Sequence, residues 1–131
     1  MWVNKVVWEH LSVSEEGRPT VFYQFLANII GNNLTRTVLP ASMSSVLGAR
    51  FLRTYAFRPQ LIYLDAAHEQ GETLMELALY WRLLRPGGVL FGDDWSWITV
   101  RCDVKKFSYM RNITIEHVGP AWLLRKPLQS T

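Results

Sequence analysis

The sequence contains one cysteine, Cys102, among its 131 residues. A single thiol excludes an intrachain disulfide and a cysteine-rich zinc site, and it is typical of proteins from a reducing compartment. The sequence also lacks an apolar run long enough to span a membrane, and residues 1–20 lack the hydrophobic segment of a signal peptide. We therefore expect a cytoplasmic protein without a membrane partner.

The sequence also has no strong excess of positive or negative charge. The formal net charge is +3, and the densest basic cluster holds only Arg101, Lys105, Lys106 and Arg111. So small a cluster favours a solvated helix face over a nucleic-acid surface, and we expect no nucleic-acid partner. The composition, 49% hydrophobic and 19% charged, is that of a folded protein. The length suits one core, so we expect a single domain over residues 1–131, with an irregular segment at 1–18.

Apolar periodicity and turn residues predict alternating helices and strands. Helices are expected after Pro19, from a cap at Ser42, Ser44 or Ser45, over 69–84, and through 100–110. Strands are expected at 36–40, 61–65, 89–92, 112–118 and 121–126. The turn at 119–120 is too short for a parallel crossover, so the last two strands form an antiparallel hairpin. This order predicts an α/β fold with a mostly parallel sheet and an antiparallel C-terminal hairpin.

Acidic residues follow two of the predicted buried strands. Asp65 ends the strand at 61–65, and Asp93 and Asp94 come directly after the strand at 89–92. One helix with short loops joins these strands, so we expect them to be neighbours with their carboxylates at one edge. Three adjacent carboxylates repel each other unless a cation, a proton or a basic partner compensates them. Oxygen ligands favour Mg²⁺, Mn²⁺ or Ca²⁺ over zinc, so the sequence predicts a divalent metal site at this edge.

Each of these residues also has a structural interpretation. An aspartate that ends a strand often caps the next helix, which explains Asp65 as well as a metal role does. Only one of Asp93 and Asp94 can act as a cap, so the pair favours a functional site. His68 is interpreted as a general base, as an additional ligand, or as an exposed residue at a helix start. Trp95 either flanks a bound ligand or belongs to the core.

Residues 59–95, PQLIYLDAAHEQGETLMELALYWRLLRPGGVLFGDDW, and the following VRCDVKKF at 100–107 carry a resemblance to a known family. They resemble the fourth-strand to fifth-helix region of class I S-adenosylmethionine-dependent methyltransferases, in particular the metal-dependent O-methyltransferase-like subgroup. The resemblance covers about residues 17–127, and the LLRPGG turn with the paired aspartates is its most specific part. It implies a Rossmann-like methyltransferase fold, with a methyltransferase-like core at 19–127.

The resemblance also implies roles for the acidic residues. Metal-dependent members hold Mg²⁺ with an aspartate after the fourth strand and an acidic or amide pair after the fifth, and Asp65, Asp93 and Asp94 occupy those positions. The metal binds a hydroxyl of the substrate, lowers its pKa and orients it for attack on the methyl group. His68 matches the histidine of the subgroup and is implied as the catalytic base, beside Asp65.

The resemblance further implies contacts to the cofactor and the substrate. Ser44 and Ser45 lie in the stretch after the family's third strand, which contacts S-adenosylmethionine. Trp95 directly follows the paired aspartates and is expected to flank a small hydroxylated substrate.

The glycine-rich turn of the family is missing from this sequence. Eight glycines are present, and no two of them form a GxG motif. Family members begin with a strand, a GxGxG turn, a helix and a second strand, whereas this sequence resembles them only after the second strand. The resemblance therefore predicts a truncated fold without the methionine and ribose contacts of the cofactor.

Three functions remain open at this point. The first is metal-assisted O-methyl transfer from S-adenosylmethionine to a small hydroxylated substrate. The second is a non-catalytic, methyltransferase-derived oligomerisation or ligand-binding module that has lost cofactor binding. The third is binding of a cation and a different small ligand at the acidic edge.

The missing first strand also predicts an interface. In the family's sheet that strand lies beside the fourth strand, so its absence leaves the strand at 61–65 with a free apolar edge, which proteins rarely leave uncovered. Either 36–40 or KVVWEH at 5–10 pairs with this edge, or two subunits close it together. We favour a homodimer through this edge, with Trp2 and Trp8 helping to bury it.

Overall fold

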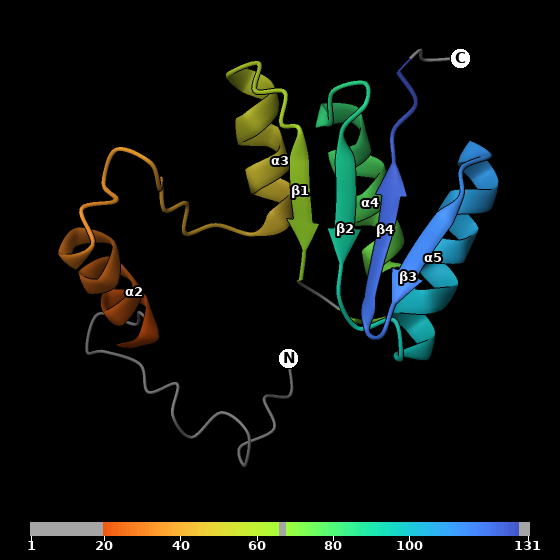
Figure 1. Ribbon diagram of the computed structural model, residues 1–131, viewed down its shortest axis with the longest axis horizontal. Helices are drawn as coiled ribbons and strands as arrows, with labels where there is room; N and C mark the ends of the chain where they lie inside the picture. Colours follow the sequence, from red (N-terminus) through yellow and green to blue (C-terminus); the bar gives the residue numbers. More distant parts are fainter. Residues whose placement is uncertain (1–19, 66–67, 129–131) are drawn as a thin grey trace. The chain divides into compact units, whose positions relative to one another are not determined.

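The computed structural model describes residues 20–65 and 68–128 (Figure 1). The expectations for residues 1–18, including the pairing of KVVWEH and the roles of Trp2 and Trp8, lie outside these residues. The chain divides into two compact units between Ala41 and Ser42, and each is described by itself. No helix among the described residues is long and apolar enough to cross a membrane.

The first unit contains helix α2, Thr20–Gly31, which confirms the helix predicted after Pro19. The strand predicted at 36–40 is wrong, because this stretch forms turns and irregular backbone. The backbone N–H groups of Thr37 and Val38 both donate to the carbonyl of Leu34 at 2.9 Å, so local turn bonds occupy them. Pro40 offers no N–H for a strand ladder.

The second unit alternates helices and strands along the chain. Its elements are α3 (Ser45–Thr54), β1 (Leu61–Leu64), α4 (Glu72–Leu83), β2 (Val89–Gly92), α5 (Ile98–Arg111), β3 (Ile115–Val118) and β4 (Ala121–Arg125). The strands form one sheet in the order β1-β2-β4-β3. This unit confirms the predicted α/β class and the antiparallel hairpin of β3 and β4.

The sheet is mixed, so the prediction of a mostly parallel sheet is wrong. Among the strands that the structure describes, β1 and β2 are the one parallel pair, because α4 carries the chain back between them. The other neighbour of β2 is β4, which runs antiparallel to it. The prediction failed because it counted 36–40 as a further parallel strand and did not place the returning hairpin beside β2.

The core lies on one face of the sheet, where α4 and α5 pack against it (Figure 1). Alternate residues of the strands point to this face, as the period of a strand requires. The buried cluster comprises Ile62, Leu64, Leu77, Trp81, Leu84, Leu90, Val100, Val104, Phe107, Trp122 and Leu124.

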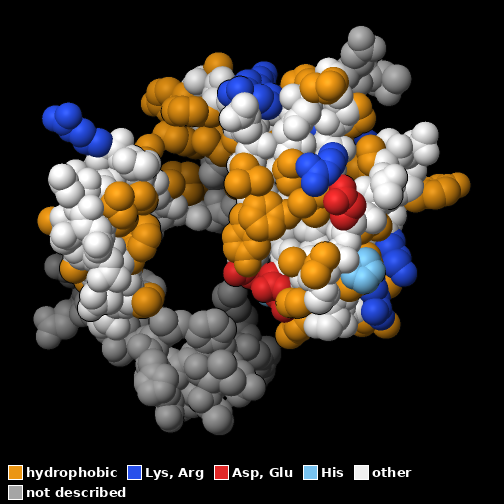
Figure 2. All heavy atoms as spheres, in the orientation of Figure 1, with side chains coloured by type: hydrophobic (Ala, Val, Ile, Leu, Met, Phe, Trp, Pro, Cys, Tyr) orange, Lys and Arg blue, Asp and Glu red, His pale blue; other side chains and the backbone are white. Residues whose placement is uncertain are grey.

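The opposite face of the sheet carries apolar side chains that are exposed within the described residues. Leu61 and Tyr63 of β1 are 62% and 50% exposed, and the ring of Tyr63 lies 4.9 Å from that of Phe91 on β2. Figure 2 shows hydrophobic side chains gathered over β1 and β2 on this face. Within the described residues, β1 is also an end strand of the sheet. The unit therefore presents both a free backbone edge and an apolar surface next to it.

Candidate functional site

The acidic residues converge because β1 and β2 are parallel and in register. Leu64 at the end of β1 pairs with Gly92 at the end of β2. Asp65 and Asp93 therefore leave the sheet side by side at its carboxyl edge, where ligands bind in open α/β sheets. The predicted meeting of the two acidic segments at one edge agrees with this register.

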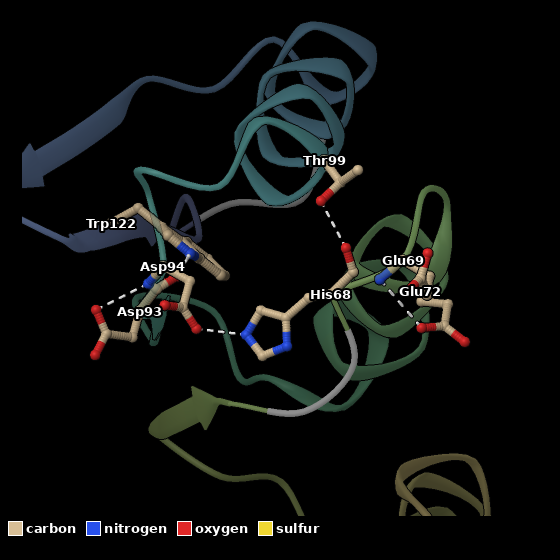
Figure 3. A network of polar contacts seen from close by, with 7 residues as sticks. All are labelled: His68, Glu69, Glu72, Asp93, Asp94, Thr99 and Trp122. Atoms are coloured by element: carbon tan, nitrogen blue, oxygen red, sulfur yellow. Dashed lines mark hydrogen bonds and ion pairs between the residues drawn. The ribbon is translucent and has the colours of Figure 1, made fainter. Parts of the chain in front are cut away.

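Three side chains form a compact group at this edge. Asp65, His68 and Asp94 each offer one potential ligand atom, and these atoms all lie within 4.8 Å of one another. The Nε2 atom of His68 is hydrogen-bonded to Oδ2 of Asp94, and the two side chains are 30% and 32% exposed. Figure 3 shows the Asp94 carboxylate pointing at the imidazole. A pair of carboxylates with one imidazole can hold a divalent cation or move a proton.

Asp93 and Asp94 point in different directions. Asp94 has a left-handed backbone with φ of 61°, a conformation that costs a residue other than glycine about 1 kcal/mol. Oδ1 of Asp93 accepts the N–H of Asp94 at 2.8 Å, and its carboxylate points away from His68 (Figure 3). Desolvation and the negative charges of Asp65 and Asp93 raise the pKa of the Tyr63 hydroxyl, so the field at this edge is negative. The role of Asp93 as a metal ligand stays a prediction.

The C-terminal hairpin holds the loop that carries these aspartates. The indole Nε1 of Trp122 on β4 donates to the carbonyl of Asp93 at 2.8 Å. The N–H of Trp95 donates to the carbonyl of Pro120 at 2.8 Å, and its ring stacks on His117 at 5.0 Å. Trp95 thus lies against the hairpin, and its contact with a substrate stays a prediction.

A different tryptophan lies beside the imidazole. The ring of Trp97 is 4.9 Å from the ring of His68, and Trp97 is exposed. Sequence reasoning missed this contact, because the N–H of Trp97 donates to the carbonyl of Asp94 in a turn that reverses the loop. The sequence indicated this turn only weakly, because Ser96 is the one residue between Trp95 and Trp97 that favours a turn.

Helix α5 holds the loop that carries His68. The hydroxyl of Thr99 donates to the carbonyl of His68 at 2.5 Å. Oδ2 of Asp103 accepts the N–H groups of Gly71 at 2.8 Å and Leu74 at 3.1 Å. One helix therefore fixes both the position of the imidazole and the start of α4.

Ser44 and Ser45, the predicted cofactor contacts, begin helix α3. Oγ of Ser44 accepts the N–H of Leu47 at 3.4 Å and caps the helix, which selects Ser44 from the three predicted caps. The carbonyl of Ser45 accepts the hydroxyl of Tyr80 at 2.8 Å. The start of α3 lies at the same end of the sheet as the Asp65 end of β1 (Figure 1). Contact of these serines with a cofactor stays a prediction.

A small cavity of about 10 Å³ lies directly under the acidic group. Its lining consists of Leu64, Asp65, His68, Thr73, Glu76, Asp93, Asp94, Val100 and Trp122. Glu76 is only 3% exposed, so a fourth acidic side chain reaches the site from α4. Sequence reasoning missed Glu76, although its place beside Leu77 on the buried stripe of the helix was an available signal.

The comparisons with known proteins concern the fold. No family model matches the chain, and no curated protein matches it. A solved structure of the O-methyltransferase from Bacillus cereus in complex with SAH is similar, with a TM-score of 0.61 and 16% identity. The match covers 88% of this chain and 60% of that chain, so this chain spans 60% of its neighbour's length.

This likeness confirms the fold that the sequence resemblance implied. The chain has a methyltransferase-like α/β fold, in which the strand ends that carry Asp65 and Asp93 lie side by side. At 16% identity the likeness is one of fold, so cofactor, metal and substrate are treated below as proposals.

Proposed function

We propose that the chain takes part in metal-assisted O-methyl transfer from S-adenosylmethionine to a small hydroxylated substrate. The observation that carries this proposal is the group of Asp65, His68 and Asp94 at the carboxyl edge of a methyltransferase-like sheet. The SAH in the O-methyltransferase neighbour supports an S-adenosyl cofactor for this fold.

The residues present fit a divalent cation. The potential ligand atoms of the acidic group lie within 4.8 Å of one another, close to the separation of about 4.2 Å between ligands on opposite sides of one ion with bonds of about 2.1 Å, so binding an ion would draw them slightly together. A cation held there supplies a Lewis acid that lowers the pKa of a substrate hydroxyl. Asp65 and Asp94 would hold it, with Asp93 as the predicted third carboxylate. His68 either accepts the hydroxyl proton or joins the ligands.

Ser44 and Ser45 are the proposed cofactor contacts, at the start of α3. Calorimetric titration with S-adenosylhomocysteine, with and without Mg²⁺ or Mn²⁺, tests the cofactor. We expect a Kd below about 1 mM. Ser45→Ala should weaken binding about fivefold, because it removes one hydrogen bond. Ser42→Ala is the matched control and should leave binding unchanged. Absence of binding at millimolar ligand would reject an S-adenosyl cofactor for this chain.

A second candidate function is a non-catalytic, methyltransferase-derived module for oligomerisation or ligand binding. Two observations favour it: no GxG motif in the sequence, and the apolar side chains of Leu61 and Tyr63, which are exposed within the described residues. The calorimetric titration separates the two candidates, because the module binds no S-adenosyl compound.

The edge of β1, which has no partner strand within the described residues, supports the proposal of a homodimer in either case. An uncovered strand edge beside exposed apolar side chains pairs readily with a second copy of the same strand. We expect light scattering to give the mass of a dimer at tens of micromolar protein. Leu61→Lys places a charge beside the edge and should shift the protein to monomer, whereas Met110→Lys on the exposed side of α5 should not. A strict monomer at this concentration contradicts the proposal.

A further inference from the structure

Three arginines of α3 and α4 surround one cavity of the second unit. Arg50 and Arg53 lie one turn apart on α3, and Arg82 lies in the last turn of α4. All three line a cavity of about 40 Å³. Within the part of the chain that the structure describes, none of them forms a salt bridge. Like charges around one cavity repel each other unless an opposite charge compensates them, so the arrangement points to an anionic occupant.

The helix ends compensate only part of this positive charge. Arg53 and Arg82 each lie in the last turn of a helix, where the helix end carries about half a negative charge. Arg50 lies one turn earlier on α3. Because a guanidinium group stays protonated at neutral pH, three of them beside two helix ends leave a net charge of about +2. Among the described residues, the lining contains no acidic side chain that could reduce this charge.

Apolar side chains form the rest of the cavity. Ala49 and Leu83 are 5% and 2% exposed, and Leu79 completes the lining. Walls of low polarity strengthen the attraction between a guanidinium group and an anion. The hydroxyl of Tyr80 on α4 donates to the carbonyl of Ser45 on α3 at 2.8 Å, which ties the two helices together. The backbone positions that carry the arginines are therefore fixed before a ligand binds.

We propose that Arg50, Arg53 and Arg82 bind a phosphate group, either as free phosphate or as part of a small phosphate ester. One water molecule needs about 10–15 Å³ of such a cavity, so about 40 Å³ has room for a tetrahedral group of several atoms. A phosphate ester carries a charge of about −1.5 to −2 at neutral pH, which matches the net charge of the cavity, whereas a carboxylate carries a single charge. Arginine also binds phosphate oxygens through two parallel N–H bonds.

This site goes beyond the proposed function. The residues that line it are different from those of the acidic group at the carboxyl edge. Neither a divalent cation nor an S-adenosyl compound contains a phosphate group, so the arginines predict a separate ligand. The test contains neither of these compounds, and failure of the proposed function therefore leaves its result intact.

The test is a calorimetric titration of the full chain with inorganic phosphate and, separately, with phenyl phosphate. Sodium chloride holds the ionic strength constant, so general screening of charge does not contribute. We expect a Kd below about 1 mM for at least one of the two compounds. Tighter binding of phenyl phosphate assigns the site to an esterified phosphate, and equal or tighter binding of inorganic phosphate assigns it to the free ion. A Kd above about 1 mM for both overturns the proposal.

Three variants locate the site. Arg82→Gln should weaken binding about tenfold or more, because it removes a hydrogen bond between charged groups. Arg82→Lys keeps the charge and loses the paired donors, so we expect an intermediate loss. Arg101→Gln makes the same change on α5, outside the lining, and should leave binding unchanged. Arg82 is exposed, so its variants should keep the fold, which circular dichroism checks. Equal weakening by Arg82→Gln and Arg101→Gln would show attraction to the overall charge and would overturn the site.

Discussion

Asp103→Ala is expected to lower the free energy of unfolding of the second unit by about 3 kcal/mol, because it leaves two helix-start donors without their acceptor. The Asp103 side chain is buried at 5% exposure, and its Oδ2 accepts the N–H groups of Gly71 and Leu74. Gly71 caps α4 without a side chain of its own and has φ of 88°. The cap of α4 therefore comes from another helix, 32 residues further along the chain.

Urea denaturation followed by circular dichroism measures this loss. Asp103→Asn is the matched variant, because it keeps an acceptor oxygen and removes the charge, so we expect roughly half the effect. Asp103→Ala should also weaken binding of Mn²⁺, since the loop from His68 to Gly71 loses its anchor. A loss below about 1 kcal/mol would show that water replaces the carboxylate as acceptor.

The same contact explains where the sequence misplaced the start of α4. Glu69 and Glu72 suggested a helix from 69, since acidic residues favour a first turn. The structure begins the helix at Glu72, after a left-handed Gly71 that Asp103 holds. Local patterns predicted the apolar strands β1 and β2 well, because a short continuous apolar run between turn residues is typical of a buried strand. A cap supplied from α5 leaves no local signal at position 69.

The sequence predicted which strands bring the candidate site together, but it did not predict the directions in which the side chains of the site point. The parallel register that brings Asp65 and Asp93 together follows from the short helical crossover between β1 and β2. The orientation of the pair does not follow from it, because the left-handed backbone at Asp94 turns two consecutive carboxylates apart. Glu76 was missed for another reason: acidic residues on helices are usually exposed, and its position on the buried stripe beside Leu77 was not weighed against that tendency.

Gly92→Ala is expected to lower the free energy of unfolding by about 3 kcal/mol or more, because the added methyl has no space. A Cβ atom at this position would lie 2.4 Å from Cζ2 of Trp122 and 2.5 Å from the backbone oxygen of Leu64. The backbone oxygen belongs to the pairing of β1 with β2, and the indole is 1% exposed. Neither neighbour can move without breaking a strand pair or the core.

Gly31→Ala is the control in the same denaturation experiment, because a Cβ atom there meets nothing within 4 Å. It should change stability by less than about 0.5 kcal/mol. Trp122→Leu removes the indole, so Gly92→Ala should cost less in that background, with the clash against Leu64 remaining. Equal costs in both backgrounds would assign the whole effect to the backbone oxygen.

The consequence of Gly92→Ala extends from the sheet to the acidic group. Trp122 can yield to the new methyl only by rotating, and its Nε1 then releases the carbonyl of Asp93. That bond holds the loop on which Asp94 faces His68, so Mn²⁺ affinity should fall together with stability. In Trp122→Leu the carbonyl is already released, and the added methyl should have little further effect on affinity. The glycine before the paired aspartates is therefore required because it lets the indole approach the loop that carries them.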